Sequence, residues 1–277
     1  MKRAFSETKV EAWQEFLEIS SPFGFKWFFR GQSMDYPLAT SIERACIDNN
    51  ILLKDAPGIE KQLIRDFSRR YDGDDRHEVL SDKLYCLALM QHHGAPTRLL
   101  DVTYSNFVAA FFAIEHSKPD KECIIWCIRG DWLFEQCRTI IPDIDLRDVD
   151  DKRNNETFED AFIEKCKKFV YPENPLYLNR RLTIQQGAFL CPGDISLPFV
   201  KNLKAMDGWR EKSNIVKLRL LLNSNFKRDA INDLNRMNIS RATLFPGLDG
   251  FAQSFWQRFG LYKKLADLKM GNPLDHK

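Results

Sequence analysis

The chain has 277 residues, of which 44% are hydrophobic and 29% charged, and its formal net charge is +2. This composition is that of a globular protein with one large domain or two small ones. No apolar run approaches the roughly 20 residues of a membrane span, so no membrane partner is expected. The seven cysteines are scattered without a CxxC pair, which indicates a reduced, cytoplasmic protein.

The charge is unevenly distributed. Residues 201–277 hold 15 Lys or Arg against 7 Asp or Glu, a net charge of +8, which leaves −6 for residues 1–200. We expect this to reflect a basic carboxy-terminal surface and a solvated acidic segment. A basic surface can also bind nucleic acid, but a nuclease is the weakest of the functions considered, since no carboxylate–lysine metal site accompanies it. No zinc motif or phosphate loop is present, and no metal is predicted.

The amino-terminal half predicts helices and strands in alternation. Helical spacing of apolar residues predicts a helix over Val10–Ile19, and an aromatic run predicts a buried strand over Phe25–Arg30. A second helix is predicted over Ile59–Tyr71, with the acidic turn at 72–75 ending it.

Two further helices flank a short strand. Ser81 is expected to cap a helix in which Leu84, Leu87 and Gln91 share one stripe, and Gly94 ends it. The strand should span Thr97–Thr103. A helix over Asn106–His116 should follow, capped by Thr103 or Ser105.

The carboxy-terminal half completes an α+β fold. A strand without polar side chains at Cys123–Ile128 should lie at the centre of the sheet. Further strands are predicted at Thr183–Leu190 and Val216–Leu222, and helices at Phe226–Met237 and Ala252–Leu268. The simplest architecture is a single domain with a mixed or antiparallel sheet core and helical decoration.

Two segments set polar side chains inside runs that should be buried, Trp27–Ser33 and Leu84–His116. In the first, Arg30 ends an aromatic run and precedes a glycine. In the second, the polar residues between two apolar helical patterns are Gln91, His92, Arg98, Asp101 and Thr103. Burying a guanidinium or carboxylate is costly unless it is paired or faces a ligand, so a ligand pocket is predicted here. The helix start after Thr103 would favour an anion such as phosphate.

These segments resemble a known family. FRGQS at 29–33 and QHHGAPTRLLDVTYSNFVAAFFA at 91–113 are similar to the FRG domain, a bacterial and phage module named for its Phe-Arg-Gly motif. RRLTIQQGAF at 180–189 and ATLFPGLDGFA at 242–252 also fit. The resemblance implies an amino-terminal helix over 1–24, an FRG domain over 25–255, and a carboxy-terminal helix or tail over 256–277.

The order of motifs is also similar to that of ADP-ribosyltransferases of the Arg class. In those enzymes an early strand presents Arg-Gly, a second strand leads into a helix, and a late strand carries Gln-x-Glu or Glu-x-Glu. FFRG at 28–31, TRLLDVT at 97–103 and IQQGAF at 184–189 stand in the corresponding order. The similarity implies an ADP-ribosyltransferase-like fold, with NAD as substrate and Arg30 holding its pyrophosphate. The final Glu is missing, since position 188 is Ala, so its role would pass to Asp101, His92 or Gln186.

The implied function is an ADP-ribosyltransferase-like enzyme that cleaves NAD or transfers from it, acting as a bacterial toxin or antiphage effector. Its acceptor would be a protein or nucleic acid. The expected ligand-binding residues are Gln32, Gln91, Arg98, Thr103 and Gln185. The alternative, which the missing Glu favours, is a sensor that binds a nucleotide or nucleic-acid end without turnover.

Structural roles remain open for the same residues. Arg30 or Arg98 could pair with Asp101, and His92 could be a satisfied core histidine.

Overall fold

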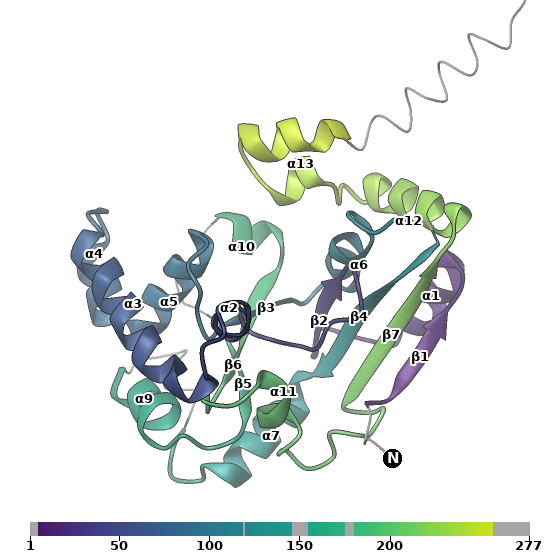
Figure 1. The fold of residues 1–277 in the computed structure, drawn as a ribbon. Helices are drawn as coiled ribbons and strands as arrows, with labels where there is room; N and C mark the ends of the chain where they lie inside the picture. Colours follow the sequence, from purple (N-terminus) through teal and green to yellow (C-terminus); the bar gives the residue numbers. More distant parts are fainter. Residues whose placement is uncertain (1–4, 119, 146–154, 175–179, 257–277) are drawn as a thin grey trace, which may run out of the picture.

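The computed structural model describes residues 5–118, 120–145, 155–174 and 180–256. In these residues seven strands form one mixed sheet with helices on both faces, which confirms the α+β prediction (Figure 1). The strand order is β1-β7-β4-β2-β3-β6-β5, and only β1 and β7 pair in parallel. The strands are β1 (Glu7–Val10), β2 (Trp27–Gln32), β3 (Leu100–Thr103), β4 (Lys121–Arg129), β5 (Val170–Glu173), β6 (Gly187–Pro192) and β7 (Ile215–Leu222).

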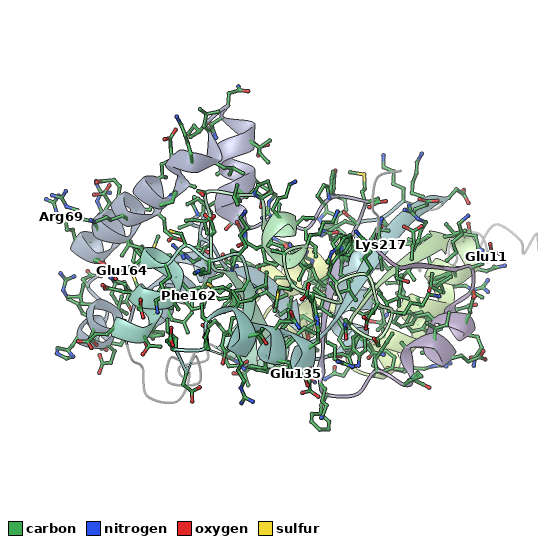
Figure 2. All side chains as sticks on the ribbon, turned by 90° about the horizontal axis from the view of Figure 1, so that it is seen from below. Glu11, Arg69, Glu135, Phe162, Glu164 and Lys217 are labelled. Atoms are coloured by element: carbon green, nitrogen blue, oxygen red, sulfur yellow. The ribbon has the colours of Figure 1, made fainter. Side chains whose placement is uncertain are left out.

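Helices connect these strands and cover the sheet. Among them are α1 (Trp13–Ser20), α2 (Ser41–Asp48), α3 (Ala56–Arg70), α4 (Arg76–Ser81), α5 (Lys83–His92), α6 (Asn106–Ile114), α7 (Gly130–Ile140), α9 (Asn155–Glu159), α10 (Arg180–Ile184), α11 (Phe199–Leu203), α12 (Ser224–Arg236) and α13 (Arg241–Leu244). Apolar residues of α1, α6 and α12 pack on one face of the sheet, and those of α5, α7 and α11 pack on the other. Side chains fill the space between the sheet and the helices on each face (Figure 2).

The central strand was predicted correctly. β4 lies between β7 and β2, and every residue from Cys123 to Ile128 is buried. Alternate residues of this strand belong to the two apolar cores, Ile124 and Trp126 to one and Ile125 and Cys127 to the other. A strand covered on both faces needs apolar side chains at every position, which is why its sequence shows no alternation.

Several boundaries differ from the prediction. The strand expected at Thr183–Leu190 begins only at Gly187, because α10 occupies the residues up to Ile184. Asp82 caps α5 in place of Ser81, its carboxylate accepting from the Tyr85 amide. Asp82 suits this position because its carboxylate satisfies an amide that the first helical turn leaves free.

Other differences concern the chain ends and β3. The strand expected from Thr97 begins at Leu100, and the side chain of Ser105 caps α6. The edge strand β1 was not predicted, because four residues paired with one neighbour leave little pattern in the sequence. The helix expected at Ala252–Leu268 is helical as far as residue 256, and its remainder lies outside the described residues.

An ion-pair network ties β1 and the loop after β2 to the sheet. Arg219 of β7 donates to Glu7 and to Asp35, each at 2.7 Å, and Lys217 donates to Asp35 at 2.7 Å. The bond from Arg219 lowers the pKa of Glu7. Burial tends to raise the pKa of Asp35, but the bonds from Lys217 and Arg219 outweigh it and lower that pKa. The network therefore fixes the loop that leads from β2 to α2.

Candidate functional site

The candidate site is a cavity of about 780 Å³ where β2 and β3 separate. β2 pairs with β4 over six residues but with β3 at one position only, Phe29 opposite Thr103. Both strands line the cavity on one side of this pair, β2 and its loop from Phe29 to Ser33 and β3 from Asp101 to Thr103. The sheet thus opens at the two segments in which the sequence predicted a pocket.

Glycine in the Phe-Arg-Gly motif has a steric role. A Cβ atom at Gly31 would lie 1.9 Å from the carbonyl oxygen of Ala109 in α6. Since the neighbouring atom belongs to the backbone, a side chain at this position would displace the helix. Gly31 therefore lets α6 pack directly on β2, with Arg30 beside it at the cavity.

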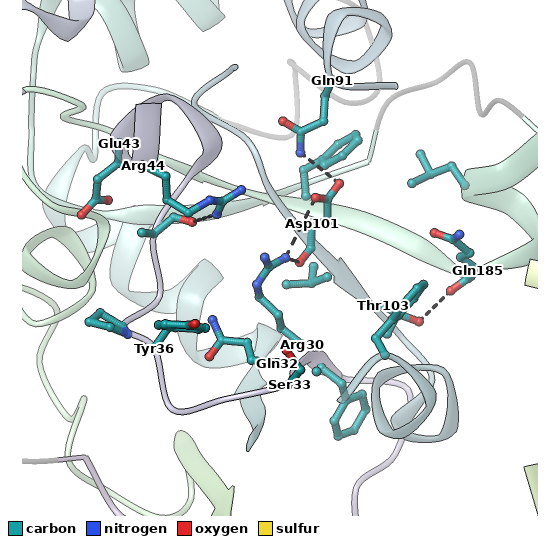
Figure 3. Close-up of a pocket in the computed structure, with 18 of the residues that line it drawn as sticks. Arg30, Gln32, Ser33, Tyr36, Glu43, Arg44, Gln91, Asp101, Thr103 and Gln185 are labelled. Atoms are coloured by element: carbon teal, nitrogen blue, oxygen red, sulfur yellow. Dashed lines mark hydrogen bonds and ion pairs between the residues drawn. The ribbon is translucent and has the colours of Figure 1, made fainter. Parts of the chain in front are cut away.

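Arg30 and Asp101 meet in this cavity (Figure 3). Nη1 of Arg30 donates to the main-chain oxygen of Asp101 at 2.6 Å and lies 4.0 Å from its carboxylate. Nε of Arg30 is buried and has no acceptor among the described residues. The pair is not a buried bridge, because the Asp101 side chain is 62% exposed while that of Arg30 is 19% exposed. The guanidinium thus keeps donor capacity, and the carboxylate remains open to the cavity.

Burial lowers the pKa of Arg30, the charge of Asp101 acts in the opposite direction, and that of Arg44 lowers it further. A cation under these conditions gains from an anion that enters the cavity, because the anion compensates for lost hydration. This supports the predicted role of Arg30 as an anion contact.

Gln91 orients the carboxylate. Its amide nitrogen donates to Asp101 at 2.9 Å and to the Leu99 carbonyl at 3.2 Å, and its amide oxygen accepts from Ser41 and Thr97. With both ends of the amide bonded, the side chain has one favoured orientation. Gln91 lines the cavity as predicted, but its role is to hold Asp101.

Three other predicted residues also line the cavity through bonds that fix them. The Thr103 hydroxyl donates to the Gln185 carbonyl at 2.7 Å. The Gln185 side chain donates to the Leu244 carbonyl at 3.0 Å, and that of Gln32 accepts from Trp126 at 2.9 Å. These bonds connect the cavity lining to β4, to α13 and to the turn between α10 and β6, and leave the cavity outline well defined.

Two predicted residues lie elsewhere. Arg98 is fully buried and bonded to Glu60 of α3 and to the Phe162 carbonyl, and it does not line the cavity. Arg98 and Glu60 are 38 residues apart in the sequence, so the periodicity of apolar residues gives no sign that they pair. Gln186 is exposed, has a φ of 47°, and is also absent from the cavity lining. We therefore retain neither as a ligand contact.

His92 lines the cavity and is exposed, which excludes the core histidine considered above. Partial desolvation lowers its pKa, as do the charges of His93 and Arg181. Its imidazole is therefore neutral at pH 7 and able to accept a proton.

Sequence reasoning missed several charged residues of the cavity. Arg44, Glu43 and Asp48 reach it from α2, and Arg181 reaches it from α10. Helix α2 was not predicted, and Arg181 fell within no interrupted apolar run. The only available signal was the resemblance of RRLTIQQGAF at 180–189 to the family pattern.

The fold and site define an α+β protein with an arginine–carboxylate cavity in a split sheet. Residues 25–122 match the FRG domain family model, so the chain carries an FRG domain. This range contains both Arg30 and Asp101. No curated protein and no solved structure matched the chain, and the ADP-ribosyltransferase similarity has no support from these comparisons.

Two other features are absent from the described part of the chain. No helix there combines the length and apolar character of a membrane span. This part of the chain also has no cluster of three or more His, Cys, Asp or Glu side chains that could hold a metal ion.

Proposed function

We propose that the cavity binds NAD and that the chain cleaves its bond between nicotinamide and ribose, as ADP-ribosyltransferases do. The observation that carries the proposal is the meeting of Arg30 and Asp101 in one cavity between β2 and β3. A volume of about 780 Å³ falls within the range of roughly 300–1,000 Å³ that is common for small-molecule sites.

Arg30 supplies the phosphate contact. A guanidinium presents N–H groups in a planar fork that matches two oxygens of one phosphate. The Arg30 side chain lines the cavity and is 19% exposed, so a phosphate oxygen can approach its guanidinium there.

Asp101 supplies the negative charge that the reaction requires. Cleavage of the glycosidic bond sends its electron pair to nicotinamide and leaves a positive charge on the ribose, which an open carboxylate stabilises. Gln91 holds this carboxylate at 2.9 Å. A water molecule or an acceptor nucleophile then bonds to ribose C1′, and neutral His92 takes the released proton. Consumption of NAD by this route would make the protein a toxin or an antiphage effector.

A second candidate function is binding of a nucleotide without turnover. Gln186 lies outside the cavity and residue 188 is a fully buried alanine, so β6 brings no carboxylate to the site. The site of a sensor needs the anion contact of Arg30 but no catalytic charge. Asp101 is the residue that separates the two functions.

The test is nicotinamide release from NAD by purified protein, measured by chromatography together with the NAD-induced change in melting temperature. Asp101→Asn keeps an oxygen for Gln91 but removes the charge, and we expect release to fall by at least about 100-fold while NAD still binds. Arg30→Lys keeps the charge but loses the fork and should weaken NAD binding, whereas the exposed Arg69→Ala (Figure 2) should match the wild type.

Binding without release in the wild type would select the sensor function. A wild-type protein that neither binds NAD nor releases nicotinamide would refute NAD cleavage, and binding of other nucleotides would then test the sensor function.

A further inference from the structure

Besides Arg30 and Arg44, the cavity holds a further cation, Arg181, that the proposed mechanism does not use. It lies in α10 and lines the cavity together with Asp101. In the described part of the chain its guanidinium makes no hydrogen bond and has no carboxylate within 4.0 Å. The charge of Asp101 acts on Arg181 as it does on Arg30, which places both guanidiniums within electrostatic range of one carboxylate.

An aromatic ring holds Arg181 in place. Its guanidinium carbon lies 4.6 Å from the ring centre of Phe245, within the range of a cation–π contact. The guanidinium carbon of Arg241 lies at the same distance from that ring, and Arg241 is itself bonded to Glu115. Phe245 also packs edge-on against Phe112, which lines the cavity. The ring is therefore fixed from several sides.

The loop of Phe245 is anchored to the base of α10. Gln185 donates to the Leu244 carbonyl at 3.0 Å, so α10 and α13 are joined beside the cavity. Residues 248–256 are helical, and a Cβ atom at Gly250 would lie 1.9 Å from the Phe245 carbonyl oxygen, so glycine lets the first turn of this helix approach the Phe245 backbone. This arrangement gives the FPGLDG segment at 245–250 a role: it positions Phe245 under Arg181.

We propose that Arg181, positioned by Phe245, forms a second phosphate subsite beside that of Arg30, so that the cavity selects ligands with two linked phosphates over monophosphates. The proposal rests on the proposed nucleotide site and names its ligand class. A ring contact leaves the N–H groups of Arg181 free for phosphate oxygens. Two arginines that approach from β2 and α10 suit adjacent phosphates better than one.

Calorimetry tests the proposal by measuring the affinity of the protein for ADP and AMP. Inorganic pyrophosphate and phosphate serve as the corresponding probes without a nucleoside. We expect the wild type to prefer ADP and pyrophosphate by about ten-fold or more, as a charge-assisted bond implies. Arg181→Ala should remove this preference while AMP affinity stays unchanged. Arg180→Ala is the matched control, since Arg180 is an exposed neighbour outside the cavity lining, and it should keep the preference.

Substitutions that remove or keep the aromatic ring test the positioning role of Phe245. Phe245→Leu keeps an apolar side chain and should reduce the ADP preference by about two- to five-fold, the size of one exposed cation–π contact, while Phe245→Tyr should restore it. A simple packing defect would weaken AMP and ADP equally, and that result would overturn the positioning role.

The outcomes separate this inference from the function proposed above. Equal affinity for ADP and AMP in the wild type overturns the second subsite, even if NAD binds. A pyrophosphate preference that depends on Arg181 in a protein that does not bind NAD supports the subsite and refutes the proposed function.

Discussion

Replacing Arg98 by Met should destabilise the protein without altering its ligand site. The Arg98 and Glu60 side chains are 2% and 3% exposed, and the guanidinium donates to the carboxylate through Nε and Nη2 and to the Phe162 carbonyl at 2.7 Å. Removing one partner of a buried ion pair costs about 3–5 kcal/mol, because the other charge stays buried and unpaired. For a chain of this size the melting temperature should fall by roughly 6–20 °C.

A second substitution separates the causes of this loss. Adding Glu60→Gln to Arg98→Met removes the unpaired charge and keeps an oxygen for the Arg98 main-chain amide, so the main remaining cost is the unsatisfied Phe162 carbonyl, about 1–3 kcal/mol. The double variant should therefore be more stable than Arg98→Met in urea unfolding followed by circular dichroism. Arg69→Ala is the control, because Arg69 is an exposed residue of α3, the helix that carries Glu60. It should change the free energy of unfolding by less than about 0.5 kcal/mol.

Two results would refute this reasoning. A melting temperature of Arg98→Met within 1 °C or so of the wild type would show that the buried pair contributes nothing. A double variant no more stable than the single one would show that the loss does not come from an unpaired carboxylate. If folded Arg98→Met lost nucleotide binding, the placement of Arg98 outside the cavity would be wrong.

Three further predictions concern other parts of the fold. Gly31→Ala should lower the melting temperature by several degrees, since its Cβ would collide with the Ala109 carbonyl, whereas Gly24→Ala, with open space around it, should not. Arg219→Gln should raise the pH at which acid unfolds the protein. The fold lowers the pKa of Glu7 and Asp35, so these carboxylates stabilise it at pH values above their unfolded-state pKa, and this stabilisation disappears as pH falls. Glu43→Gln should raise the melting temperature at pH 8 and not at pH 4, because burial raises the pKa of Glu43 and ionisation then destabilises the fold as pH rises. Equal effects at both pH values would contradict that last prediction.

The sequence alone determined the elements whose pattern is local. β4 followed from an uninterrupted apolar run and α6 from helical spacing with Ser105 at its start. The cavity followed from charged residues in segments that had to be buried, and Arg30 and Asp101 do meet there. These patterns are visible within a few residues of sequence, because an apolar run, helical spacing and a charge inside such a run are all local.

Only the tertiary structure decided which charges pair and which face the cavity. Arg98 and Arg30 both lie within apolar runs of the sequence. In the fold Arg98 pairs with the buried Glu60 of α3, whereas Arg30 lies beside the exposed Asp101 in the cavity. Arg181 entered the site from α10, and the sequence predicted no element at that residue. Each outcome depends on partners tens of residues away, and side-chain periodicity carries no information about such contacts.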